Sequence, residues 1–365
     1  MKKRFWENFF PGRPGKAFSA WQIELTTRCP LQCRMCCREG HTGLSRKDMS
    51  LEDFKRILPY LTRVEAVVLE GWGESLLHPN LIDCINLVKT AGPRVGFVTS
   101  GKTLNEAYIS ELVRAQVDFI GFSLSGATPE THNSIRVHSD LQDLLKHIQG
   151  FQEEKARLKC PNPHLHIVYL LLKENIAEVP ALIRLARDLK IEEVVLIHIA
   201  LVSNPWQEEQ RVFGLEPIED YKNIIREAQR MARDFRIRLV VPTLAPQEVA
   251  VCSENPLRNL YISVDGEVSP CVYLNPPLPS TFKRIFHGAE FQTAKVIFGN
   301  ILHEPFDRIW ANPEYEEFRG CFARRVREFE ELYASLWEGG RRRGGRQTFP
   351  DPPRPCQTCY KIEGA

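Results

Sequence analysis

The stretch that decides the fold is WQIELTTRCPLQCRMCC, residues 21–37. A β-prone run at 21–25 is followed directly by three cysteines with the spacing C-x3-C-x2-C, namely Cys29, Cys33 and Cys36. Parallel α/β folds build their ligand sites on the loops that follow strands. Thiols crowded on such a loop more often bind metal than form disulfides. The segment therefore predicts a strand that carries a metal-binding loop.

Working outward, short apolar and β-branched runs recur along the chain and alternate with amphipathic stretches. Two of these stretches, 81–88 and 182–189, carry apolar stripes near the helical period. This alternation indicates repeated βα units around a parallel sheet, with six or seven units in all. The further strands are expected at 66–69, 95–99, 119–124, 166–172, 194–199 and 238–241.

Small and polar residues end several of these strands, so we expect them to line one pocket at the carboxyl edge of the sheet. After about residue 241 the βα alternation stops, while prolines and cysteines become frequent. We therefore expect an N-terminal extension at 1–20, a barrel domain at 21–245 and a cysteine-rich module at 246–365. We interpret the Gly-, Arg- and Pro-rich run at 339–355 as an exposed loop. The alternative is that its basic side chains bind an acidic substrate.

Composition narrows the classes of protein. The 365 residues include 48 basic and 46 acidic side chains, so no broad electrostatic footprint for nucleic acid or an anionic membrane is present. No apolar run reaches the roughly 18 residues of a membrane span, and the first ten residues lack the apolar core of a signal peptide. We expect a cytoplasmic protein without nucleic-acid or membrane partners.

The eleven cysteines are clustered and odd in number, which argues against a disulfide framework. A [4Fe-4S] cluster used only for electron transfer normally takes four cysteines. Three thiolates, from Cys29, Cys33 and Cys36, would leave one iron free to bind another molecule. Cys37 as a fourth ligand and a structural zinc site remain the alternatives.

With this loop after its first strand, the sequence resembles the radical S-adenosylmethionine (SAM) superfamily. The resemblance implies a partial (β/α)6 TIM-like barrel in which the open iron binds SAM. It further implies reductive cleavage of SAM to a 5′-deoxyadenosyl radical, with an electron from a low-potential donor such as ferredoxin or flavodoxin. The family usually has an aromatic residue before the third cysteine, where this chain has Met35.

Two more segments match the family's SAM-binding motifs: LEGWGE at 69–74 and GFSLSGATPETHNSIR at 121–136. The first is similar to the family's Gly-Gly-Glu segment, and the second places serines and an arginine after the fourth strand. An ordinary serine-rich turn is the alternative for the second segment, and we expect His132 on the surface. The SAM-binding residues that the resemblance implies are Gly71, Gly73, Glu74, Ser100, Ser123, Ser125 and Arg136.

The C-terminal module resembles the SPASM and twitch modules of radical SAM enzymes. Cys252 and Cys271 flank an expected hairpin that turns at Asp265-Gly266, and Cys356 and Cys359 form a C-x2-C pair. Too few residues follow Cys359 for a complete second set of ligands. The resemblance thus implies one auxiliary iron–sulfur cluster, of the [4Fe-4S] type, on these four cysteines. A zinc or rubredoxin-like site is the alternative. We take Cys321 as a spare thiol, with replacement of one of the four ligands as the alternative, and Cys84 and Cys160 as buried, inert thiols.

The fold class expected overall is α/β: a partial TIM-like barrel with a small C-terminal α+β iron–sulfur domain. The resemblance implies modification or maturation of a peptide or protein substrate. It extends to a subgroup described as maturases for tungsten-containing oxidoreductases. Oxidation of a small-molecule alcohol, with the auxiliary cluster as electron acceptor, is one alternative. A non-catalytic iron–sulfur or zinc protein is another.

Overall fold

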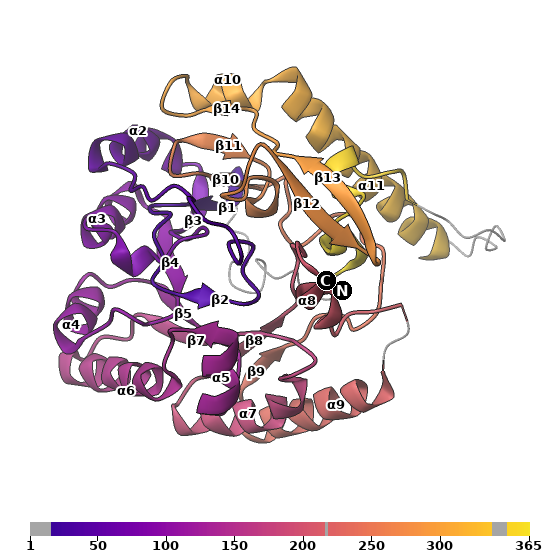
Figure 1. Ribbon diagram of the computed structural model, residues 1–365. Helices are drawn as coiled ribbons and strands as arrows, with labels where there is room; N and C mark the ends of the chain where they lie inside the picture. The colour runs from indigo at the N-terminus through magenta and orange to yellow at the C-terminus, as the bar shows by residue number, and fades with distance from the viewer. Residues whose placement is uncertain (1–15, 216–217, 338–348) are drawn as a thin grey trace.

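Between residues 18 and 240, seven parallel strands form an arc with helices on its outer side (Figure 1). The computed structural model describes residues 16–215, 218–337 and 349–365. The parallel strands are β1 (Phe18–Ile23), β3 (Val64–Val68), β4 (Arg94–Thr99), β5 (Phe119–Leu124), β7 (His164–Leu170), β8 (Glu193–Ile197) and β9 (Arg238–Val240). They lie in the sheet in chain order from β1 to β9. The expected open α/β barrel is confirmed, and every expected strand is present to within a few residues.

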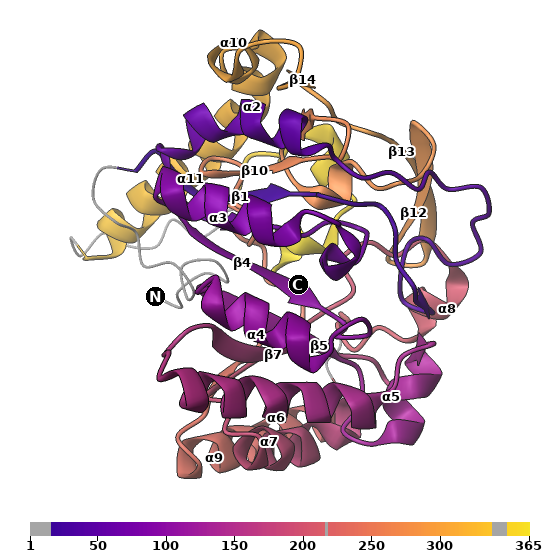
Figure 2. The same ribbon diagram turned by 90° about the vertical axis from the view of Figure 1, so that its left-hand side faces the viewer.

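Amphipathic helices cover the outside of this arc, as Figure 2 shows from the side. In α3, Leu81, Cys84, Ile85 and Val88 are buried, which is the spacing of one helix face turned to the sheet. Cys84 is therefore a core residue of this face. The outer helices are α2 (Leu51–Leu61), α3 (Leu81–Ala91), α4 (Glu106–Arg114), α6 (Leu141–Leu158), α7 (Val179–Asp188) and α9 (Glu219–Asp234).

Short elements decorate the carboxyl ends of the strands. The two-residue strands β2 (Gln32–Cys33) and β6 (Arg136–Val137) pair with each other. The remaining short helices of this part are α5 (Pro129–Ile135), α8 (Pro205–Glu209) and the 3-10 turns at Ser75–Leu77 and Ile176–Glu178.

The C-terminal part of the chain continues the barrel sheet. β10 (Asn259–Ile262) pairs in parallel with β1, and β11 (Glu267–Ser269) and β14 (Gly299–Asn300) extend the sheet antiparallel beyond it. The expected hairpin is therefore present, but the pairing of its first strand with β1 was not predicted. A second hairpin, β12 (Thr281–Phe286) with β13 (Ala289–Ala294), forms a separate small sheet. Helices α10 (Phe306–Trp310) and α11 (Pro313–Trp337) follow, with 3-10 turns at Val272–Leu274, Arg354–Cys356 and Tyr360–Glu363.

Aromatic side chains fasten this C-terminal part to the first strand. Phe18 lies 5.4 Å from Trp21 and 5.6 Å from Phe306, and Trp21 lies 4.7 Å from Phe306, all between ring centroids. Such pairs contribute about 0.5–1.5 kcal/mol each beyond burial. The sheet thus runs across the boundary that we expected near residue 245, and the three-part division of the chain remains a prediction.

Two expectations concern segments outside this core. Most of the Gly- and Arg-rich run at 339–355, and most of the N-terminal extension, lie outside the described residues. Within the described ranges, none of the helices combines the length and apolar character needed to cross a membrane.

Candidate functional site

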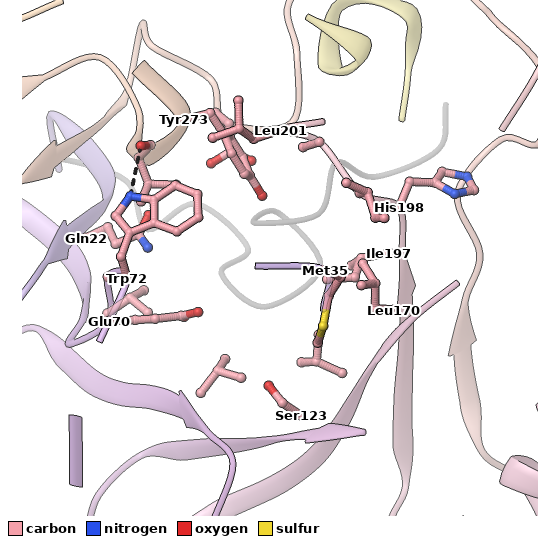
Figure 3. Close-up of a pocket in the computed structure, with 18 of the residues that line it drawn as sticks. Gln22, Met35, Glu70, Trp72, Ser123, Leu170, Ile197, His198, Leu201 and Tyr273 are labelled. Carbon is pink, nitrogen blue, oxygen red and sulfur yellow. Dashed lines mark hydrogen bonds between the residues drawn. The ribbon is translucent and has the colours of Figure 1, made fainter. Parts of the chain in front are cut away.

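A cavity of about 290 Å³ opens inside the arc of strands. Its walls are inward-facing side chains of six strands and residues of the loops at their carboxyl ends. Figure 3 shows Glu70 and Ser123 directed into the hollow, with Met35 on the far side. The lining includes Glu70, Gly71, Trp72, Ser123, Arg136 and Lys361. The pocket therefore lies where strand-end residues predicted it.

The cysteine loop is held across the mouth of this cavity. It leaves β1 on one side, and on the other Cys33 pairs with Arg136 through strands β2 and β6. The amide of Arg34 also donates to the carbonyl of Ile135 at 3.0 Å. Because both ends are fixed, the thiols of this loop have a defined position relative to the sheet.

The three cysteines of the motif are free thiols; Cys33 is buried, and Cys29 and Cys36 are partly exposed. Burial raises the pKa of Cys29 to about 12 and that of Cys33 to about 11. The pKa of Cys36 is instead lowered to about 7, chiefly because the thiol of Cys37 donates a hydrogen bond to it. Arg136 contacts Cys33 and also favours its thiolate. Cys29 and Cys33 therefore ionise readily only when positive charge, such as that of an iron cluster, lies nearby.

Cys37 is placed differently from its neighbours. Its side chain is buried in an apolar cluster with Leu201, Leu278 and Phe282. Its thiol is engaged as a donor to Cys36. Cys37 also lines the large cavity, whereas Cys29, Cys33 and Cys36 do not, so Cys37 as a fourth ligand stays an alternative.

The Gly-Trp-Gly-Glu loop packs against the segment that leads to the first cysteine. A β-carbon on Gly73 would lie 2.1 Å from the carbonyl oxygen of Thr26, and one on Gly71 would meet the side chain of Glu24 at 2.5 Å. The amide of Trp72 donates to that Glu24 carboxylate at 2.7 Å. Close contacts within the chain thus require glycine at both positions, independently of any contact with a ligand.

Glu74 uses its carboxylate within the protein. Its oxygens accept hydrogen bonds from the hydroxyl of Thr99 at 2.6 Å and from the amide and hydroxyl of Ser100 at 2.9 and 2.7 Å. Glu74 and Ser100 are buried and do not line the cavity. These bonds fix the loop after β3 to the end of β4, so any effect of either residue on SAM would be exerted through the loops they hold.

The segment after β5 brings one of its serines and its arginine to the cavity. Ser123 and Arg136 line it, whereas Ser125 is fully buried and accepts a hydrogen bond from the Nε of Arg136 at 3.0 Å. His132 is buried, contrary to our surface expectation, because its ring contacts the Ser125 amide at 3.3 Å and the hydroxyl of Ser139 at 3.0 Å. Burial lowers the pKa of His132 to about 3, so the ring is neutral.

The four late cysteines surround a second, smaller hollow. Burial raises the pKa of every thiol for which a shift is resolved, Cys252 to about 12 and Cys271 and Cys356 well above their usual range. Among the residues the structure describes, no three Cys, His, Asp or Glu side chains converge closely enough for a single metal ion.

Cys321 lies outside this group. It is on α11, does not line the hollow, and its sulfur accepts a hydrogen bond from Arg324 at 3.2 Å. This placement agrees with the spare-thiol prediction.

Three side chains that sequence reasoning missed separate the two hollows. Glu254, Tyr273 and Lys361 line both the large cavity and the cysteine hollow. Each stands two residues after a cysteine of the hollow, which is a pattern visible in the sequence but without meaning until the fold brings the segments together. The indole of Trp72 adds a further link, donating to the carbonyl of Val272 at 3.3 Å.

Glu70 directly precedes the glycine loop and is one of the polar strand-end residues that we expected to line the pocket. Its side chain faces the cavity (Figure 3) and makes no hydrogen bond or ion pair with the described residues. Burial raises the pKa of Glu70 to about 8, with smaller contributions from Glu254 and Glu74. A carboxyl group in this state is largely protonated at neutral pH.

Comparison with known proteins identifies two families along the chain. The Radical SAM superfamily matches residues 23–186, and the iron–sulfur cluster-binding domain called SPASM matches residues 252–360. Together these matches contain the cysteine loop, the glycine loop and all four late cysteines.

Individual relatives have low sequence identity to this chain, but the similarity extends over most of its length. The tungsten-containing aldehyde ferredoxin oxidoreductase cofactor-modifying protein of Pyrococcus furiosus is 26% identical over 305 residues, covering 81% of this chain and 82% of its own. The PqqA peptide cyclase of Gluconobacter oxydans is 25% identical over 305 residues, covering 81% of this chain and 78% of its own.

Solved structures share the fold. SuiB of Streptococcus suis bound to S-adenosylmethionine superposes with a TM-score of 0.63 at 13% identity, over 83% of this chain and 68% of that one. Native anSMEcpe with bound AdoMet gives a TM-score of 0.59 at 13% identity, over 82% of each chain.

Proposed function

Because the chain is a radical SAM enzyme with a C-terminal SPASM-type iron–sulfur domain, we propose that it modifies a peptide or protein. A [4Fe-4S] cluster, SAM and auxiliary iron–sulfur chemistry belong to these two domains. When bound, the cluster and SAM supply a 5′-deoxyadenosyl radical that abstracts hydrogen from the substrate.

The thiols of Cys29, Cys33 and Cys36 are the proposed ligands of the SAM-binding cluster. The observation that carries the proposal is their position beside the cation of Arg136 on one loop fixed at both ends, whose Met35 and Cys37 line the cavity. Arg136 stabilises the thiolate of Cys33, and the Cys37 thiol does the same for Cys36.

The proposed SAM contacts divide into two groups. Gly71, Ser123 and Arg136 line the cavity and can touch SAM directly. The others act by holding these elements: Gly73 permits the close contact with the cysteine loop, Glu74 and Ser100 join the ends of β3 and β4, and Ser125 orients Arg136. We propose Cys252, Cys271, Cys356 and Cys359 as ligands of one auxiliary cluster in the second hollow.

The relatives support a polypeptide substrate. One is named for modifying the cofactor of a tungsten enzyme and another for cyclising the PqqA peptide. A tungsten oxidoreductase is the specific partner we propose to test first, with ferredoxin or flavodoxin as the reductant. The low sequence identity is why the substrate needs a direct experiment.

The test uses the anaerobically reconstituted protein, SAM and dithionite, with proteins encoded beside its gene as candidate substrates. We expect 5′-deoxyadenosine together with a mass change in one candidate, and neither product with Cys33→Ser. Cys160→Ser is the matched control and should retain activity, since this half-buried thiol lines neither hollow and the serine hydroxyl can donate to the same Val113 carbonyl. An alcohol that becomes two mass units lighter, with every polypeptide unchanged, would replace our proposal by the dehydrogenase alternative. No 5′-deoxyadenosine at all, with both clusters assembled, would indicate a non-catalytic protein.

A further inference from the structure

The wall between the two hollows contains an ion pair shielded from solvent. Lys361 Nζ lies 3.4 Å from Glu254 Oε1, and these side chains are only 12% and 11% exposed. The ammonium group also donates to the Ser253 hydroxyl at 3.2 Å and lies 5.4 Å from the centre of the Tyr273 ring. The pair is therefore held in a defined place.

This pair directly borders the cysteine hollow. Lys361 and Glu254 line it together with the four cysteines, and each follows one of those cysteines by two residues. The rest of the lining is largely apolar, including Phe318 and Phe322. Charges in such surroundings interact over longer distances than in water, because little solvent screens them.

We propose that Lys361 and Glu254 set the reduction potential of the auxiliary cluster, in opposite directions. Reduction adds one negative charge inside the hollow. The ammonium of Lys361 stabilises that added charge and raises the potential, whereas the carboxylate of Glu254 opposes it and lowers the potential. Both are positioning residues that act through the cluster and bind no iron.

The position of the ion pair between the two hollows connects the potential of the auxiliary cluster to the large cavity. Since Lys361, Glu254 and Tyr273 also line the large cavity, a substrate that contacts the pair changes the field at the auxiliary cluster. Occupancy of the cavity and the ease of reducing the cluster are thereby linked through one set of side chains. This inference rests on the proposed auxiliary cluster and does not depend on which substrate the enzyme takes.

The experiment is a potentiometric titration of the reconstituted holoenzyme, followed by electron paramagnetic resonance without substrate. Lys361→Met should lower the ratio of reduced to oxidised auxiliary cluster about tenfold at a fixed potential, which is a shift of 59 mV for one electron. Glu254→Gln should shift the potential the other way. Lys361→Arg should restore the wild-type value because it keeps the charge.

Controls separate tuning from damage. Lys283→Met removes a more exposed ammonium, paired with Glu290, from the β12–β13 hairpin of the same region, and should leave the potential unchanged. The SAM-binding cluster in the same sample should keep its spectrum. Equal potentials in all variants, or shifts of the same sign for Lys361→Met and Glu254→Gln, would overturn the proposal.

Loss of auxiliary iron from both variants would overturn it as well, since the pair would then hold the hollow together instead of tuning it. A wild-type protein without any auxiliary cluster would show this in its iron content before titration. Such a result would count against the four-cysteine assignment, whereas failure to modify any polypeptide would leave the measured potentials standing.

Discussion

Replacing Glu70 by glutamine should abolish a loss of stability at high pH that the wild-type protein shows. The carboxyl group faces the cavity without a hydrogen-bonding or ionic partner among the described residues, and burial raises its pKa from 4.5 to about 8. Glutamine has nearly the same shape and stays neutral at every pH. The substitution therefore removes the charge and keeps the packing.

The size and direction of the effect follow from linkage. With the folded pKa above the unfolded one, the contribution of Glu70 to stability is fully present below pH 4.5 and is lost as the pH rises through about 8. A shift of one unit corresponds to about 1.4 kcal/mol, so the full loss has an upper limit of about 5 kcal/mol. Water that enters the cavity will reduce this figure, and about 2–3 kcal/mol is a reasonable expectation.

Two measurements check this. Infrared difference spectra of protein labelled with ¹³C-glutamate should show a protonated carboxyl band that disappears with a midpoint near pH 8 and is missing in Glu70→Gln. Anaerobic denaturant midpoints at pH 6 and pH 8.5 should fall more for the wild type than for the variant. Comparing the two proteins cancels the titration of all other groups.

If the protonated carboxyl band between pH 6 and 8 were the same in the wild type and in Glu70→Gln, Glu70 would not be the protonated group. An equal pH dependence of the denaturant midpoints in both proteins would refute the prediction too. Either result would mean that the cavity solvates the carboxylate well and that Glu70 is charged at neutral pH.

Three further predictions concern packing and iron content. Gly73→Ala should displace the glycine loop and lower the iron bound at the SAM site, because its β-carbon would overlap a main-chain oxygen, whereas Gly150→Ala inside α6 should be neutral or stabilise by about 0.5–1 kcal/mol. Thermal denaturation and iron analysis compare the two. Arg325→Met should cost about 1–3 kcal/mol of unfolding free energy, since its fully buried guanidinium donates to main-chain carbonyls before β10 that methionine leaves unpaired; an unchanged denaturant midpoint would contradict this. Cys321→Ser should keep the full iron content, while Cys356→Ser should lose the auxiliary share; equal losses would place Cys321 among the ligands.

Most of the parallel strands could be predicted because they are buried on both faces and therefore form short apolar runs; the exception is β9, whose three residues are exposed or half-buried. The run at 119–124 is an example, since expected and observed limits agree. The pairing of β10 with β1 could not be predicted in this way. Its register joins residues about 240 positions apart, and nothing local in either strand specifies that neighbour.

The residues of the candidate site likewise divide into those that local sequence reveals and those that only the fold brings together. Cys29, Cys33 and Cys36 stand out because their spacing carries the chemistry. Glu254 and Lys361 do not, since their significance arises only where two distant segments meet at one wall.

Hydrogen bonding explains other differences. Glu74 reads as a ligand-binding carboxylate, yet its acceptors are taken up by Thr99 and Ser100. His132 was expected on the surface because the short helix that contains it begins with polar side chains, yet its ring is buried. Sequence patterns indicate which groups are present, and only tertiary contacts decide which remain available.

The place of β1 in the middle of the sheet has a consequence for biosynthesis. This strand is made before the other strands of the sheet, but one of its two hydrogen-bonding edges stays unpaired until residues 259–262 have been made. An uncovered edge invites pairing with other chains. Newly made protein should therefore depend on chaperones until late in synthesis, and a chain truncated after residue 245 should aggregate instead of yielding an isolated barrel.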